Sequence, residues 1–174
     1  LRCVQWNARG WKRRKTELLH RLEETNADVV FLQESNILKG EDIRADGWEF
    51  IRKDRTAARR ADGDIQGGGI LIMIRKGIEY SALSAKLPAR DKTTEAIGVR
   101  IYPYKGKPVD IYNFYIPPIK SGEADSRTQN FDPNCLPKGE RTFICMDSNQ
   151  HHGDWEDFGK VSELGIKISE WMQD

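Results

Sequence analysis

Four apolar segments of this sequence each run into side chains that can bind a metal ion or a phosphate group. Segments 3–6, 28–32, 109–114 and 142–146 lead to Asn7, Glu34, Tyr115 and Asp147. In α/β folds, ligands bind beyond the carboxyl ends of strands, so these side chains are expected to meet at one mouth. Carboxylate, amide and phenol groups suit a hard cation and a phosphodiester.

Glu34 is the strongest metal-ligand candidate because it follows a five-residue apolar run, Asp28 to Leu32. Mg2+ prefers one or two carboxylates, with waters and substrate phosphate oxygens completing its coordination. Glu34 together with Asn7 fits this sparse set, with Mn2+ as an alternative ion. The other interpretations are a helix cap or exposed charge for Glu34, and a strand-ending amide that satisfies backbone groups for Asn7.

Asp147 and Asn149 are two residues apart, so on an extended chain they point the same way. The carboxylate can then position or deprotonate a water while the amide holds a phosphoryl oxygen. An Asx turn before His151 is the alternative. The phenol of Tyr115 can donate to a phosphate, although a lone tyrosine here also suits a core or rim position.

His151 and His152 are adjacent and have no HxxxH or cysteine partner, which argues against a zinc site. A rim or structural role with a substrate contact fits His151 better, and packing fits Trp155. The cysteines form no CxxC pair, which favours a reducing compartment. Cys3 and Cys145 lie in strand-like runs and are expected to be buried.

The chain is expected to form one domain, residues 1–174, because its length permits a single sizeable core. Charged residues make up 32% and the net charge is only +1, so charge alone does not indicate a polyanion partner. Two basic clusters, 12–15 and 52–60, and a long polar loop, 119–140, are candidates for DNA contact or for solvated surface. No apolar run is long enough to cross a membrane.

Periodicity predicts the elements that position these residues. Strands are expected at 1–7, 27–32, 48–51, 70–74, 79–87, 94–102, 109–114 and 142–146, with helices at 12–24 and 160–173. Asn26 is expected to terminate the first helix. Gly67, Gly68 and Gly69 lack a following GK[ST] and predict a bulge or close backbone approach at a strand start, not a phosphate loop.

The ordered motifs resemble the endonuclease/exonuclease/phosphatase superfamily, and within it the apurinic-like endonuclease domain of non-LTR (LINE-type) retrotransposons. The motifs are Gln5–Gly10, Leu32–Ser35, Gly67–Lys76, Asn113–Pro118 and Met146–His152. The family pattern Gly-Asp-Phe-Asn is replaced by Met-Asp-Ser-Asn at 146–149, which keeps the acid and the amide. The resemblance implies a four-layer α/β sandwich, two packed mixed sheets flanked by helices, with its C-terminal strands missing from this chain.

The resemblance also implies residue roles. Asn7 and Glu34 would bind the metal, Gln33 would support Glu34, and Asp147 would orient the attacking water. Tyr115 and Asn149 would hold the scissile phosphate, and Asn7, Gln33, Asn113 and His151 would lie at the substrate. A Ser-Asp-His set with an essential histidine is expected after Asp174. Residues 1–174 alone are therefore expected to nick DNA weakly or not at all.

The implied function is Mg2+-dependent nicking of target DNA for target-primed reverse transcription. The implied partners are double-stranded DNA and a reverse transcriptase domain in the same polypeptide. The domain is expected to be an intracellular monomer that acts in the nucleus and does not bind a membrane. Two alternatives stay open, namely a phosphatase for lipid or small-molecule phosphates and a catalytically inactive nucleic-acid-binding fragment.

Overall fold

A computed structural model describes residues 1–54, 68–91, 93–118, 131–157 and 159–174, which form two four-stranded sheets. The first sheet has the order β1 (Cys3–Asn7), β2 (Val29–Gln33), β4 (Ile70–Arg75) and β3 (Trp48–Lys53). The second has the order β5 (Glu79–Leu83), β6 (Glu95–Tyr102), β7 (Val109–Tyr115) and β8 (Thr142–Asp147). The pairs β1–β2 and β7–β8 are parallel, and the other pairs are antiparallel.

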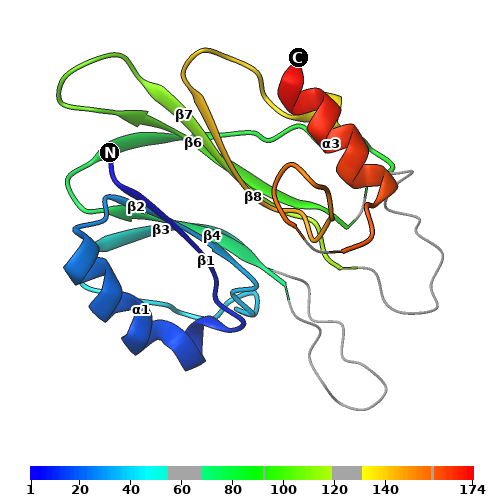
Figure 1. The fold of residues 1–174 in the computed structure, drawn as a ribbon. Helices are drawn as coiled ribbons and strands as arrows, with labels where there is room; N and C mark the ends of the chain where they lie inside the picture. Colours follow the sequence, from blue (N-terminus) through cyan, green and yellow to red (C-terminus); the bar gives the residue numbers. More distant parts are fainter. Residues whose placement is uncertain (55–67, 92, 119–130, 158) are drawn as a thin grey trace.

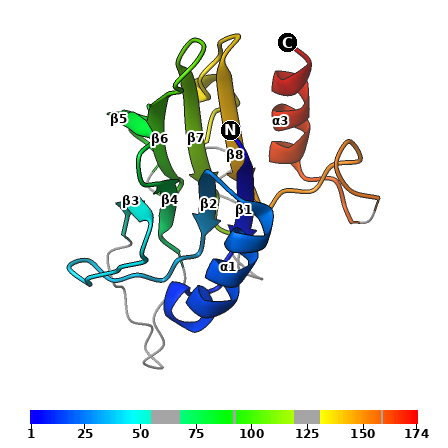
Figure 2. The ribbon, with the colours of Figure 1, turned by 90° about the vertical axis from the view of Figure 1, so that its left-hand side faces the viewer.

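The two sheets pack face to face between two helices, as Figures 1 and 2 show. Helix α1 (Trp11–Thr25) covers the outer face of the first sheet, and α3 (Glu163–Gln173) covers the second. A short 3-10 helix, η1 (Pro133–Cys135), lies against α3. The prediction of a four-layer α/β sandwich of two mixed sheets is confirmed.

Strand β2 shows why the sheets pack in this way, because all five of its residues are buried. Val29 and Phe31 face the second sheet, where they join Val99 and Ile111 in the central core. The alternating residues of β2 face α1 instead. A nearly continuous apolar run is typical of a strand covered on both faces, as the sequence predicted.

Helix α1 follows its predicted pattern closely. Trp11, Leu18 and Leu22 are buried against the first sheet, and the charged side chains lie on the other faces. Asn26 ends the helix in the left-handed conformation with φ +50°, and its N–H bonds to carbonyls of the last turn. The parallel β1–α1–β2 unit brings Asn7 and Gln33 into register, so it positions the strand ends that carry the candidate site.

Two local predictions are wrong. The second helix begins at Glu163, not at residue 160, because Ser162 caps it, and Val161 is 48% exposed outside it. Cys3 is exposed, not buried, because in the described structure β1 pairs only with β2 and lies at the sheet edge. Cys145 is buried as predicted, and its burial raises the pKa of its thiol to about 12.

Some predictions lie outside the described residues. These are Gly67, the second basic cluster from Arg55 onward, and the polar loop at 119–130. Gly68 and Gly69 are described, and both have positive φ, +133° and +81°, at the close approach that the sequence predicted. In the described part of the chain, no helix is long and apolar enough to cross a membrane.

Candidate functional site

Asn7, Glu34, Tyr115 and Asp147 form one hydrogen-bonded network at neighbouring strand ends of the two sheets. The Nδ2 atom of Asn7 donates to Glu34 Oε1 and to Asp147 Oδ2, each at 2.8 Å. The phenol of Tyr115 donates to Glu34 Oε1 at 3.2 Å. Tyr115 and Asp147 are paired residues at the ends of β7 and β8. The packing of the two sheets therefore brings together four residues that are widely separated in the sequence.

The turn after β2 aims the side chain of Glu34. Glu34 has φ +51°, a left-handed conformation that is strained for a non-glycine residue and typical of functional sites. Its carbonyl accepts the N–H of Gly10 at 2.8 Å, and the next N–H, of Ser35, bonds to Gly69 O at 2.8 Å. These bonds on both sides hold the strained residue between β1 and the glycine turn before β4.

Glu95 is a buried carboxylate beside this turn that sequence reasoning missed. It is 7% exposed, and its Oε2 accepts the N–H of Gly69 at 2.8 Å. It is also the register partner of Tyr115 across β6 and β7. The sequence offered one signal for Glu95. It is a carboxylate at the first position of an alternating apolar strand, beside the edge where the other candidate strands end.

Burial and negative charge together control the phenol of Tyr115. The residue is 3% exposed. Burial is the largest cause that raises the pKa of Tyr115 above its usual range, and the Glu34 carboxylate adds to it. The phenol is therefore protonated at neutral pH and acts as a hydrogen-bond donor.

The donor set at this site fits a hard divalent cation. Glu34 and Asp147 share one neutral donor, Asn7, and no Lys, Arg or His of the described residues forms an ion pair with either carboxylate. Two uncompensated carboxylates side by side are what a sparse Mg2+ site offers. No group of three or more His, Cys, Asp or Glu side chains suited to a metal occurs in the described ranges.

The orientation of Asn7 differs from that of a ligand. Its amide nitrogen faces the carboxylates, while Oδ1 accepts the N–H of Arg9 at 3.3 Å. An amide presents oxygen or nitrogen by a half-turn about its last side-chain bond. A role for Asn7 as a metal ligand therefore requires that half-turn.

The expectation that Asp147 and Asn149 point the same way is wrong. Strand β8 ends at Asp147, and Asn149 has φ +49°, so the chain between them is not extended. The Nδ2 of Asn149 instead donates to Ile116 O at 3.0 Å. Asn149 thus ties the loop after β8 to the chain that leaves β7, beside Tyr115. The turn itself is closed by Ser148, whose Oγ accepts the N–H of Gln150 at 3.3 Å.

Gln33 and Asn113 were expected at the substrate, and the structure contradicts a direct contact. Both side chains are 0% exposed. Gln33 Nε2 donates to Asn113 Oδ1 at 2.7 Å, and Asn113 Nδ2 donates to the carbonyls of Leu32 and Leu71 at 3.1 and 3.0 Å. Buried amides that bond across two sheets join the sheets together and are closed to a ligand. No bond joins the Gln33 side chain to Glu34.

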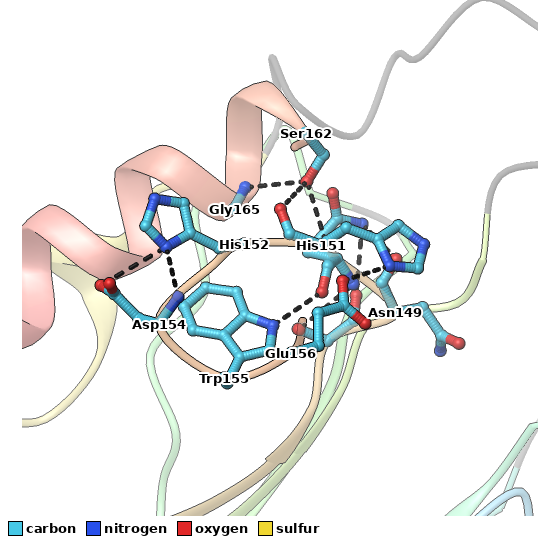
Figure 3. Close-up of polar contacts among 10 residues, drawn as sticks. Asn149, His151, His152, Asp154, Trp155, Glu156, Ser162 and Gly165 are labelled. Carbon is cyan, nitrogen blue, oxygen red and sulfur yellow. Dashed lines mark hydrogen bonds and ion pairs between the residues drawn. The ribbon is translucent and has the colours of Figure 1, made fainter. Parts of the chain in front are cut away.

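The two histidines lie on opposite sides of the loop after β8 (Figure 3). His152 packs against Trp155 with ring centroids 5.2 Å apart, and its Nδ1 accepts the N–H of Asp154 at 3.2 Å. The imidazole of His151 is 56% exposed and lies 2.5 Å from Glu156 Oε1 through its Nδ1. Trp155 packs as predicted and donates its Nε1–H to Gln150 O at 3.0 Å.

Residues 4–163 match the model of the Endonuclease/Exonuclease/phosphatase family. No curated protein sequence matches the chain. The fold is similar to that of the AP endonuclease LMAP from Leishmania major (TM-score 0.65, 16% identity, 97% of this chain and 65% of that one). It is also similar to the Xenopus laevis APE2 catalytic domain (TM-score 0.64, 14% identity, 99% and 67%).

A third similar structure is a 3′–5′ exonuclease (NExo) from Neisseria meningitidis, with TM-score 0.61 and 16% identity over 98% of this chain and 68% of that one. At these identities the likeness concerns the fold. The chain spans 65% of the Leishmania protein and about two-thirds of the other two.

Proposed function

Because the chain belongs to the Endonuclease/Exonuclease/phosphatase family, we propose that it contains the metal- and phosphate-binding residues of a hydrolase that cuts phosphodiester bonds in DNA. The observation that carries this proposal is the network of Asn7, Glu34, Tyr115 and Asp147. It combines two carboxylates without a cationic partner in the described chain, a protonated phenol and an amide. These are the groups that phosphodiester hydrolysis needs.

Glu34 and Asn7 would hold the divalent ion, Mg2+ or Mn2+, and Asp147 shares the Asn7 amide with Glu34. When bound, the ion neutralises charge on the phosphoryl oxygens during hydrolysis. The strained backbone of Glu34 fixes its carboxylate at this position before the ion arrives. Asn7 would hold the ion through Oδ1, which a half-turn of its amide would present.

The remaining residues act on the phosphate and the water. Tyr115 donates its O–H to a phosphoryl oxygen after exchanging its bond to Glu34. Asp147 accepts a hydrogen bond from the attacking water and orients it in line with the scissile bond. The bond from Asn149 to Ile116, the residue after Tyr115, holds Asn149 near Tyr115. Its amide donates to the same phosphate.

We further propose that the substrate is double-stranded DNA and that the hydrolase nicks target sites for a LINE-like retrotransposon in the nucleus. A reverse transcriptase domain in the same polypeptide would extend the exposed 3′ end. The proposal is supported by the glycine turn before β4, the His151-His152-x-x-Trp155 motif and the basic start of α1, Lys12 to Lys15, which follows Asn7 closely. Backbone contacts by lysine and arginine would make binding salt-dependent.

The test measures conversion of supercoiled plasmid to open circles by a polypeptide that contains residues 1–174, with and without Mg2+. The expected result is Mg2+-dependent nicking that Glu34→Gln and Asp147→Asn each remove, while Glu49→Gln, a change on β3, leaves it intact. Phosphoinositides are assayed in parallel. Metal-dependent phosphate release from them, with no nicking of plasmid, would overturn the proposal in favour of a phosphatase.

A further inference from the structure

The imidazole of His151 is held in a built position, although it is largely exposed. The backbone N–H of His151 donates to Ser162 Oγ at 3.2 Å, and the backbone carbonyl of His151 accepts the N–H of Ser162 at 3.0 Å. The same Ser162 Oγ caps α3 by accepting the N–H of Gly165 at 3.0 Å. The backbone of His151 is therefore fastened to the first turn of a helix (Figure 3).

Two glycines make room for this arrangement. A Cβ at Gly165 would lie 2.3 Å from the carbonyl oxygen of His151, which is closer than real contacts allow. A Cβ at Gly159 would lie 3.3 Å from His151 Nδ1, and Gly159 has φ +121°, which favours glycine. Gly165 and Gly159 thus lie tightly against the backbone and the ring of His151, respectively.

Glu156 determines which ring nitrogen faces the solvent. Its Oε1 lies 2.5 Å from His151 Nδ1. A carboxylate only accepts hydrogen bonds, so Nδ1 carries a hydrogen and Nε2 is the nitrogen left for another partner. Carboxylates commonly orient functional histidines in this way. His152 lies on the other side of the loop, and its Nδ1 is 3.4 Å from Asp154 Oδ2. That nitrogen accepts the N–H of Asp154 at 3.2 Å, so it acts as an acceptor, unlike Nδ1 of His151.

The pair is also linked to the candidate site. Asn149, two residues before His151, bonds to Ile116, which follows Tyr115. Figure 3 shows the Asn149 side chain and the His151 ring on the side of the loop away from α3. A polyanion seated at Tyr115 and Asn149 would place further phosphates along this side. A ring that donates Nδ1–H to a carboxylate and Nε2–H to a phosphate carries hydrogen on both nitrogens, so His151 takes its second proton from water when the phosphate binds.

We propose that His151 and Glu156 form a phosphate-binding dyad for a DNA strand at the candidate site. His151 donates Nε2–H to a backbone phosphate other than the scissile one, and Glu156 is the positioning residue that aims the ring. This inference rests on the proposed function, because it requires a polymeric substrate with several phosphates.

The test measures the affinity for a fluorescein-labelled DNA duplex by anisotropy in a metal-free, chelator-containing buffer, across a range of salt concentrations. His151→Gln is expected to raise Kd about three- to tenfold and to reduce the salt slope by up to about one. Glu156→Ala is the sharper test, because loss of a negative charge should by itself tighten DNA binding. The dyad predicts weaker binding instead, with Glu156→Gln, which keeps an acceptor for Nδ1–H, retaining most of the affinity.

The chain provides a matched control pair on α1. His20 Nε2 lies 3.5 Å from Glu24 Oε1, and both side chains are exposed. His20→Gln and Glu24→Ala should leave the DNA affinity nearly unchanged. An independent readout is the nitrogen NMR signal of His151, which should report the Nδ1–H tautomer in the wild type and lose that preference in Glu156→Ala.

The outcomes separate the dyad from the function as a whole. The dyad alone would be overturned if His151→Gln bound DNA with the same affinity as the wild type. Tighter DNA binding by Glu156→Ala than by the wild type would also overturn it. Absence of any DNA binding by the wild type would overturn both the dyad and the choice of DNA as substrate. If His20→Gln lost as much DNA affinity as His151→Gln, the loss would be a general charge effect, and the dyad would again be overturned.

Discussion

The amide of Asn7 bonds to the carboxylate of Asp147 at 2.8 Å, across 140 residues of sequence and between the two sheets. Asn7 ends β1 in the first sheet and Asp147 ends β8 in the second. The same amide nitrogen also bonds to Glu34. The candidate site therefore exists only where the sheets pack together, and Asn7 is the neutral group that separates two carboxylates.

Replacing Asn7 should destabilise the protein in a cation-dependent way. Asn7→Ala removes both hydrogen bonds and leaves Glu34 and Asp147 facing each other, which should lower the free energy of unfolding by about 2 kcal/mol without divalent ions. Mg2+ should restore part of this loss because it neutralises the same carboxylates. Urea unfolding with and without Mg2+ measures the effect. A loss that is equal in both buffers would contradict it.

The buried pair Gln33 and Asn113 should behave as one unit in unfolding experiments. Asn113→Leu breaks three hydrogen bonds and leaves the buried amide nitrogen of Gln33 without the acceptor that Asn113 provides. We therefore expect the free energy of unfolding to fall by about 3 kcal/mol. Gln33→Leu in the same background should cost less than it does alone, with a coupling of about 1 kcal/mol or more. Urea unfolding of the four proteins gives the double-mutant cycle, and strictly additive losses would show that the amides are independent.

Tyr115 should make stability fall at alkaline pH. Its folded-state pKa is raised above its unfolded value, so its contribution is fully present below about pH 10 and is lost as the pH rises further. Above that pH, the free energy of unfolding of the wild type should therefore fall more steeply than that of Tyr115→Phe. The difference should be up to about 1.4 kcal/mol per pH unit. Tyr80 and Tyr112 are present in both proteins, so the difference isolates Tyr115. Parallel stability curves above pH 10 would refute this.

Gly165 should be intolerant of a methyl group, and Gly153 provides the matched control. Gly165→Ala places Cβ against the His151 carbonyl and should cost about 2 kcal/mol. Gly153 lies in the loop before α3, with nothing within 4 Å of its Cβ position, so Gly153→Ala should change stability by less than about 0.5 kcal/mol. Thermal unfolding of both variants makes the comparison, and equal midpoints would be inconsistent with the packing described.

The sequence predicted the elements well where local patterns determine them. The apolar run before Gln33 predicted a strand buried on both faces, and the leucines that predicted the helix, Leu18, Leu19 and Leu22, pack against the first sheet. The expectation that Asn7, Glu34, Tyr115 and Asp147 meet followed from strand ends, and the structure brings all four together. Their roles in binding and hydrolysis stay predictions.

The wrong expectations arose where backbone conformation or long-range packing decides. Asn149 was expected to be extended, but its left-handed φ turns the side chain toward Ile116, and periodicity does not report that turn. Gln33 and Asn113 were expected at the site because the family resemblance implied it. Strand alternation and the second sheet bury them instead. Glu95 was missed because its partner, Gly69, comes from another part of the chain. Glu156 was missed because the loop that brings it to His151 has no periodic pattern.

The most direct test of the central claim is Mn2+ binding to the 174-residue chain, measured by electron paramagnetic resonance and by calorimetry. We predict a single bound Mn2+ in the wild type and affinity at least about tenfold weaker in Glu34→Gln and in Asp147→Asn. Glu49→Gln, which changes a carboxylate that bonds to Tyr80 on another part of the surface, should bind as the wild type does. Absence of Mn2+ binding by the wild type, or equal affinity in all four proteins, would contradict the account.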